Sequence, residues 1–393
     1  MREKRISNYT RNLLISVAVL IGVLIFSLIL RTNVKVCEFI CRYFVNAYQQ
    51  VAGRVFAFAP YNVFEALAAV AVLLAITCVT SSIVFLCKKK KSVAGKIMLT
   101  LATVVLCVIN IYIFTAGFAY NRKGAPVGAY EGEVDADFAL QTYAAIVEDY
   151  NSLYDKLEKD GDGAVVCPYT RKDLANKIRD AIDSGLTDSY YYKYTPKAKA
   201  ITCSEIMAQC HVAGITFLPT VEPGYNKDMS MTEQCTTIAH EFAHAKGVMR
   251  EDEANVVGIY ALLNSQDDYL RYCAYFNIVG DITHFLPFEN RAELKKQYPL
   301  NDGYKAEWKK IGEYWETKTL LGNIGEFFNN IYLKINGQKE GTDSYDEKPS
   351  TDIIDSGQVD EEGNTIYIEI ITQYTKMDRM LLGYCAENLL NTK

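Results

Sequence analysis

The sequence predicts three N-terminal transmembrane helices followed by a mainly α-helical, α+β domain that carries a small β element. Three observations support this fold class. Apolar residues crowd into the first 120 positions, most of the charge lies after them, and the polar remainder follows helical periodicity with one short β-prone stretch. We expect residues 1–123 to form a membrane anchor and residues 124–393 to form a separate domain.

Three apolar runs account for the anchor, at about residues 13–30, 63–87 and 97–118. Each run is long enough to cross about 30 Å of hydrocarbon, since an α-helix rises about 1.5 Å per residue. A cleaved signal peptide is the alternative for the first run. It fits poorly, because no small-residue cleavage site follows the run and two further spans do.

Basic residues predict the orientation of the anchor. The N-terminus, MREKRISNYTR, and the loop before the third span, KKKKSVAGK, are dense in Lys and Arg, and such segments stay in the cytoplasm. Residues 31–62 hold only four basic residues and are expected outside, as an amphipathic helix on the outer leaflet. We therefore predict a multi-pass protein of the cell membrane, in contact with the lipid bilayer, whose C-terminal domain is extracytoplasmic.

Helices dominate the predicted domain. Periodicity predicts helices over 138–157 and 169–185, the second with Thr170 as its cap and Gly185 as its stop. Residues 198–226 are β-prone around a short helical stretch and predict a small strand pair or an edge strand. Helical stripes that we expect in the core are marked by Ile311, Trp315, Ile324, Phe327, Phe328 and Ile331.

An acidic β-hairpin is predicted over residues 351–372. Isoleucines alternate along its second half, and the stretch DEEGN supplies the turn. We expect this hairpin to be a peripheral insertion, with a partner-binding ribbon as the alternative.

Charge and cysteine usage exclude some classes of function. The net charge is −6 and no basic stripe interrupts it, so we expect no nucleic-acid partner. The eleven cysteines contain no CxxC pair, which excludes a zinc ribbon or a thioredoxin-like motif. Six of them lie after residue 124, an even number that permits disulfides without requiring them.

The stretch IAHEFAHAKGVMREDEAN (residues 238–255) carries the chemistry. Its helix has a start signal in Ser230 and Glu233, which have the spacing of a capping box. Gly247 suits a left-handed stop just after the helix. His240 and His244 therefore lie one turn apart on one rigid element and project in the same direction.

Two such imidazoles are what a tetrahedral zinc ion needs from one helix. Glu241 lies about 100° further around the helix, where it can reach a metal-bound water as general base without being a ligand itself. We therefore predict Zn²⁺ bound by His240 and His244, with Glu241 as the catalytic residue. A surface helix without metal is the alternative interpretation.

Zinc needs a third protein ligand, and Glu251 is the preferred candidate. It lies four residues before Asn255, so both face the same way on a second helix that begins near residue 250, and Asn255 can orient a histidine ring. The pair resembles the Glu-x-x-x-Asp signature of gluzincins, with Asn in place of Asp. Glu253, Asp252 and His284 remain alternatives for the third ligand.

The spacing departs from both known patterns. Only six residues separate His244 from Glu251, fewer than gluzincins usually place there. Gly247 instead resembles the glycine of the metzincin pattern HExxHxxGxxH, but Arg250 occupies the place of the third histidine and arginine cannot ligate a metal. The turn at Gly247 must therefore bring Glu251 back to the ion.

The chain resembles a family of bacterial membrane proteins, defined as a domain of unknown function with an HExxH core. The resemblance covers the three spans and the segments FAPYNVFEAL, AGITFLPTVEPGYN, HEFAHAKGVMREDEAN, YLRYCAYF and NGQKEGTDSY. The acidic hairpin departs from it and looks inserted before MDRMLLGYCAEN. The resemblance implies a zincin-like fold for the domain and supports peptidase chemistry without naming a substrate.

Together these features predict a zinc-dependent metalloendopeptidase, gluzincin-like, that acts on a peptide or protein substrate. Tyr272, Arg271 and Tyr260 are the candidates for stabilising the oxyanion, and residues 215–222 are the candidate edge strand for an extended substrate. The alternative is a non-catalytic, membrane-anchored binding or scaffold protein with a structural or vestigial metal site. The intact Glu241 argues against it, because a purely structural site has no need of a base.

Overall fold

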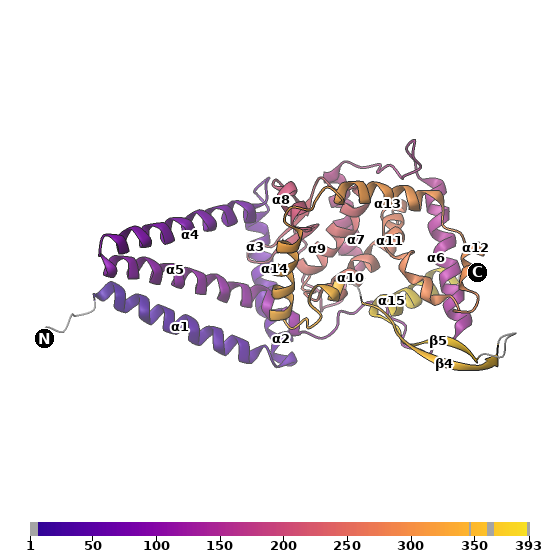
Figure 1. Ribbon diagram of the computed structural model, residues 1–393, viewed down its shortest axis with the longest axis horizontal. Coiled ribbons are helices and arrows are strands. Elements are labelled where there is room, and N and C mark those ends of the chain that lie inside the picture. Colours follow the sequence, from indigo (N-terminus) through magenta and orange to yellow (C-terminus); the bar gives the residue numbers. More distant parts are fainter. Residues whose placement is uncertain (1–6, 346, 360–364, 391–393) are drawn as a thin grey trace.

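The computed structural model describes residues 7–345, 347–359 and 365–390 of the chain. Three long apolar helices lead away from a mainly helical body that also holds two small sheets (Figure 1). The three helices are α1 (Asn8–Leu30), α4 (Val63–Cys87) and α5 (Lys91–Tyr112), and each is long and apolar enough to cross a membrane. The prediction of three candidate spans is confirmed.

The spans differ slightly from their predicted bounds. Ser7 caps α1 by accepting a hydrogen bond from the backbone of Thr10, so this helix begins five residues before the predicted Leu13. The third span begins within the lysine loop. Beyond the end of α5 it continues through two short helical segments, η2 (Ile113–Gly117) and η3 (Ala119–Asn121). The second span has the predicted bounds.

A helical segment between α1 and α4 attaches the spans to the body. It consists of α2 (Val34–Ile40), η1 (Cys41–Val45) and α3 (Asn46–Phe56), which agrees with the helix predicted within residues 31–62. Its buried side chains form a small core with the end of the third span and with the body, made of Cys37, Cys41, Val45, Ile113, Ala116, Phe118, Ala119, Tyr120, Tyr192, Leu218 and Met249.

Two central helices form the middle of the body, α9 (Met231–Ala245) and α10 (Glu251–Leu263), and they pack closely against each other. The surrounding helices cover them with a core of tyrosine, leucine and isoleucine side chains. These helices are α6 (Ala136–Lys156), α7 (Arg171–Gly185), α11 (Asp268–Ile278), η4 (Asp281–Phe285), α12 (Arg291–Gln297), α13 (Asp302–Trp315), α15 (Lys376–Cys385) and η6 (Ala386–Leu390).

A three-stranded sheet lies against α9. Its strands β1 (Lys199–Ile201), β3 (Glu222–Asn226) and β2 (Gly214–Phe217) are arranged in that order, and the short helix α8 (Ser204–Gln209) joins β1 to β2. β1 runs parallel to β3, whereas β2 is antiparallel to it, with Ile215 opposite Gly224. The predicted edge strand 215–222 is therefore only partly right: β2 is the edge, and the chain turns before β3.

The predicted helices and hairpin of the body are present. α6 and α7 match the predicted ranges within two residues, and Thr170 caps α7 by accepting from the backbone of Asp173. β4 (Ser350–Val359) and β5 (Thr365–Gln373) pair antiparallel as the predicted hairpin. Its predicted turn, residues 360–364, lies outside the described residues. All eleven cysteines are free.

One prediction about the core is wrong. Ile311 is buried and Trp315 is half-buried as expected, but the predicted stripe of α14 (Gly322–Ile335) faces outward. Its members Ile324, Phe327, Phe328 and Ile331 are 40–64 % exposed. The helix is attached to the body by its other side, where Leu333 is fully buried. A helical stripe shows which face is apolar, but it does not show what that face contacts.

Candidate metal centre

The start and the end of α9 have the predicted geometry. Ser230 accepts a hydrogen bond from the backbone of Glu233, and the Glu233 carboxylate accepts one from the backbone of Ser230, which completes the capping box. Gly247 follows the helix with φ of +92°, a left-handed conformation that glycine adopts without strain. This turn reverses the chain so that α10 begins only four residues later, directly beside α9.

Three side chains converge between α9 and α10. Oε2 of Glu251 lies 3.1 Å from Nε2 of His240 and 3.3 Å from Nε2 of His244. Potential ligand atoms of the three residues all lie within 4.8 Å of one another, and the two rings are nearly perpendicular at 87°. The group could hold a metal ion, and it is the one proposed from the sequence.

Neighbouring acceptors fix the orientation of both imidazoles. Nδ1 of His240 lies 2.7 Å from Oδ1 of Asn255, and Nδ1 of His244 lies 2.8 Å from the backbone oxygen of Val248. Each Nδ1 can donate its proton to its own fixed acceptor, which leaves Nε2 of each ring, on the side of Glu251, as the nitrogen that a metal ion would bind. Two neutral imidazoles and one carboxylate are a donor set that suits Zn²⁺.

The electrostatics of the three groups favour a bound cation. Burial alone would raise the pKa of Glu251, but the two histidines outweigh burial and lower this pKa to about 2. Burial alone would lower the pKa of His244, but Glu251 outweighs burial and raises it to about 9. Without a metal, the group therefore traps a proton between carboxylate and imidazole, in the place where a metal ion would neutralise the same charges.

Glu241 lies beside this group and is held by the edge strand. Its side chain is buried, and Thr216 of β2 donates a hydrogen bond of 2.6 Å to its Oε2. Burial raises the pKa of Glu241, although the two histidines oppose the shift. Gly214 of the same strand leaves room for the carboxylate, because a Cβ at this position would lie 2.8 Å from Cγ of Glu241.

Tyr345 joins the site from a distant part of the sequence. It ends the short helix η5 (Gly341–Tyr345), and its ring lies 6.3 Å from that of His240 between centroids. Its backbone oxygen accepts a hydrogen bond of 3.1 Å from Nδ2 of Asn255, and its hydroxyl accepts one of 3.4 Å from Nδ2 of Asn329. Burial and then Glu251 raise the pKa of Tyr345 well above its usual value, so this hydroxyl is a neutral donor.

A family model for proteins of unknown function, DUF3810, matches residues 41–350. The chain belongs to the DUF3810 family. The match contains both central helices, the edge strand and Tyr345, whereas α1, most of the hairpin and α15 lie outside it. No curated protein and no solved structure matches the chain.

The alternative third ligands of this DUF3810 member have other partners. Glu253 pairs with Arg250, and Asp252 pairs with Lys376. His284 lies 2.9 Å from Asp378. None of the three belongs to the group that could hold a metal ion among the described residues.

The three candidates for stabilising the oxyanion all have contacts within the body. Tyr272 is fully buried and stacks on Tyr150 with 5.3 Å between ring centroids. Arg271 pairs with Asp149, and Tyr260 is half-buried beside Gly128. Sequence reasoning missed Tyr345 because no local pattern links it to α9. The only sequence signal is that Tyr345 ends the segment NGQKEGTDSY, which shares the family resemblance with the motif.

Proposed function

We propose that the protein is a membrane-anchored zinc metalloendopeptidase whose active site is formed by His240, His244, Glu251 and Glu241. The observation that carries this proposal is the convergence of two oriented imidazoles and one carboxylate beside a second, buried carboxylate. A purely structural site would need the first three groups but not the fourth. When bound, zinc would act as a Lewis acid that makes a water molecule acidic near neutral pH.

Each remaining step belongs to side chains of this chain. Glu241 would accept the proton of the attacking water and pass it to the leaving amine, a role suited to a buried carboxylate with a raised pKa. The hydroxyl of Thr216 orients Glu241 from β2. Tyr345 would donate a hydrogen bond to the oxyanion, since its hydroxyl is neutral and lies at the site.

The edge strand supports an extended peptide as substrate. β2 has a neighbour on one side only, so its other side offers backbone donors and acceptors. Because Thr216 on β2 contacts Glu241, a peptide paired with this strand would pass directly over the catalytic carboxylate. This geometry favours cleavage within a chain.

The variant Glu241→Gln tests the catalytic role. Glutamine keeps an acceptor for Thr216 but cannot take a proton, so we expect zinc content to stay at one ion per chain while hydrolysis of fluorescein-labelled casein falls by at least about 10²-fold. Glu313→Gln, at an exposed position of α13, is the matched control and should keep full activity. Undiminished hydrolysis by Glu241→Gln would remove this residue from the mechanism, and absence of zinc from the wild type would refute the site.

We also propose that residues 124–393 lie outside the cytoplasm, because the basic segments flank the opposite ends of the spans. Cys203 is an exposed thiol on the body, between β1 and α8. A membrane-impermeant maleimide should label it in intact cells, and Cys203→Ser should remove that label. Labelling only after lysis would place the body in the cytoplasm.

A further inference from the structure

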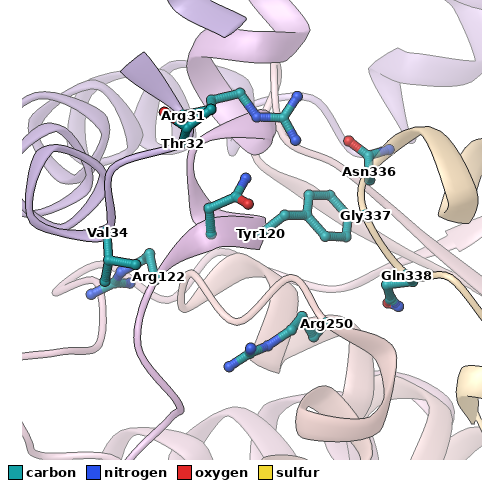
Figure 2. Close-up of a pocket in the computed structure, with 10 residues that line it drawn as sticks. Arg31, Thr32, Val34, Tyr120, Arg122, Arg250, Asn336, Gly337 and Gln338 are labelled. Carbon is teal, nitrogen blue, oxygen red and sulfur yellow. The ribbon is translucent and has the colours of Figure 1, made fainter. Parts of the chain in front are cut away.

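A cavity of about 300 Å³ lies where the spans meet the body (Figure 2). Three separate parts of the chain line it: the residues after α1, the end of the third span, and the body with the turn after α14. The ten lining residues include three arginines but no Asp or Glu: they are Arg31, Thr32, Val34, Tyr120, Asn121, Arg122, Arg250, Asn336, Gly337 and Gln338. The lining itself therefore carries basic side chains and no acidic one.

Arg31 is the unusual member of this group. The residue is only 7 % exposed, its Nε atom has no hydrogen-bond partner, and no carboxylate in the described part of the chain pairs with it. Its guanidinium points into the cavity above the ring of Tyr120 (Figure 2). Burial lowers the pKa of Arg31, although the nearby Tyr112 and Tyr120 oppose this shift.

The other two arginines have protein partners. Arg122 pairs with Glu38 at 3.1 Å and donates to the backbone oxygen of Tyr190, and Arg250 pairs with Glu253. A buried charge without a partner costs several kcal/mol in general, so a cation such as Arg31 is usually matched by an anion. An anion that enters the cavity from outside the chain would supply the partner that Arg31 lacks.

The position of the cavity identifies the source of this anion. Arg31 follows directly after the last residue of α1, which is long and apolar enough to cross a membrane, so a bilayer crossed by α1 would place Arg31 in the headgroup region. Tyr120 lies at the end of the third span, and its hydroxyl lies 3.0 Å from that of Tyr332 on α14. Tyrosine at the end of a span is typical of the membrane interface, so α14 lies at this depth as well.

The outward face of α14 agrees with a lipid environment. Ile324, Phe327, Phe328, Ile331 and Ile335 fall within an arc of about 100° on the helix, and all are 40–73 % exposed. The helix is drawn across the ends of the three spans (Figure 1). An exposed apolar stripe on one face of a helix is typical of a helix that lies in the interface plane.

We propose that the Arg31 cavity binds the phosphate of a phospholipid from the leaflet on the side of the body, while the apolar face of α14 lies in that leaflet beside it. Arg31 supplies the charge and a planar set of donors, which suits a phosphate oxygen pair. The proposal does not depend on a metal at the other site. The cavity is nevertheless in contact with the candidate metal centre, because Gln338 of the cavity accepts a hydrogen bond of 3.1 Å from the backbone of Glu251.

The test uses the full chain, purified in detergent and stripped of lipid. Dihexanoyl phosphatidylglycerol should raise its melting temperature by about 5 °C near saturation, whereas inorganic phosphate at the same concentration should raise it by less than half as much. Arg31→Gln should abolish the lipid response and Arg31→Lys should keep part of it. Arg42→Gln, at an exposed position of η1, is the matched control and should respond like the wild type.

Three results would overturn the proposal. An undiminished lipid response in Arg31→Gln would show that the guanidinium is not the ligand. A response to inorganic phosphate equal to the lipid response would identify a free anion as the occupant. If Arg31→Gln cannot be purified, native mass spectrometry compares the wild type with Arg31→Lys. The lysine variant should lose a retained phospholipid more easily, and equal retention by both proteins would overturn the proposal.

The role of α14 has its own variant. Phe328→Glu should weaken the lipid response while leaving the phosphate response unchanged, because the side chain is exposed and does not line the cavity. Phe288→Glu is the matched control, since Phe288 is also exposed and lies three residues before α12, which Figure 1 places at the far end of the body. An unchanged lipid response in Phe328→Glu would show that the face of α14 does not contact the lipid. A wild-type dimer that becomes a monomer in Phe328→Glu would assign this face to a second copy of the chain.

Discussion

Gly214→Ala offers the sharpest test of how the edge strand and the catalytic carboxylate depend on each other. A Cβ built at this position would lie 2.8 Å from Cγ of Glu241 and still closer to its Oε1, whereas ordinary contact begins at 3.4 Å. The side chain of Glu241 must therefore withdraw by at least about 0.6 Å at Cγ and by about 1 Å at the carboxylate. A displacement of about 1 Å costs on the order of 10²-fold in rate, or about 2.7 kcal/mol of transition-state stabilisation.

The assay compares casein hydrolysis, zinc content and melting temperature. Gly214→Ala should lose about 10²-fold in kcat while zinc stays bound, because the atoms nearest to the new Cβ belong to Glu241 and Thr237 and not to the three residues that would hold the ion. Gly312→Ala is the control, since nothing lies within 4 Å of a Cβ at that helical position.

The double variant Gly214→Ala/Glu241→Gln separates a local effect from a general one. If the alanine acts through the carboxylate, it should add no further loss to that of Glu241→Gln, because the two changes disable one group. Two outcomes would refute the reasoning. One is full activity of the single variant, and the other is a loss of zinc that accompanies the loss of activity.

Three further predictions concern the metal group. Gly258→Ala would place a Cβ 3.1 Å from the backbone nitrogen of His240, which cannot yield easily, so we expect a loss of about 1–3 kcal/mol in unfolding free energy by denaturant titration and weaker zinc binding. Asn255→Ala removes the acceptor that orients His240 and should weaken zinc binding by about 10–100-fold in a chelator competition, and unchanged affinity would refute this orienting role. In the metal-free protein, burial lowers but Glu251 more strongly raises the pKa of His244, to about 9. Because this folded-state pKa exceeds the unfolded value of about 6.5, the protonated pair stabilises the fold fully below pH 6.5 and its contribution disappears as the pH rises through 9. Thermal melts with chelator across this range should show the decline, and His244→Asn should remove it.

The part of the site that the sequence predicts is the part encoded locally. A capping box at Ser230 and a glycine at position 247 set the two ends of α9, and the i, i+4 spacing of the histidines then fixes their common direction. The short turn leaves few places for the next helix, which favours Glu251 as the third ligand but leaves Glu253, Asp252 and His284 open until the structure is seen. The cap of α7 at Thr170 and the bounds of the second span were also predicted correctly. Both depend on neighbouring residues in the sequence and need no distant partner.

The missed features depend on what a residue meets in space. Phe327 and Phe328 form a correct apolar stripe, but periodicity cannot distinguish a face packed on protein from one turned away from it. Tyr345 lies 94 residues after Glu251 in the sequence and reaches the site only because α14 and η5 fold back over it. The edge strand was predicted, but its contact with Glu241 through Thr216 requires the packing of β2 on α9.

The proposed lipid site and the proposed active site share one wall, and this has a mechanistic consequence. The turn after α14 lines the arginine cavity with Gln338 and leads directly into η5, which ends at Tyr345 beside the metal group. Gln338 also accepts from the first residue of α10. A phosphate bound to Arg31 would therefore order the same turn that positions Tyr345. Because ordering one element benefits both ligands, lipid binding and the binding of a transition-state analogue should strengthen each other by equal factors.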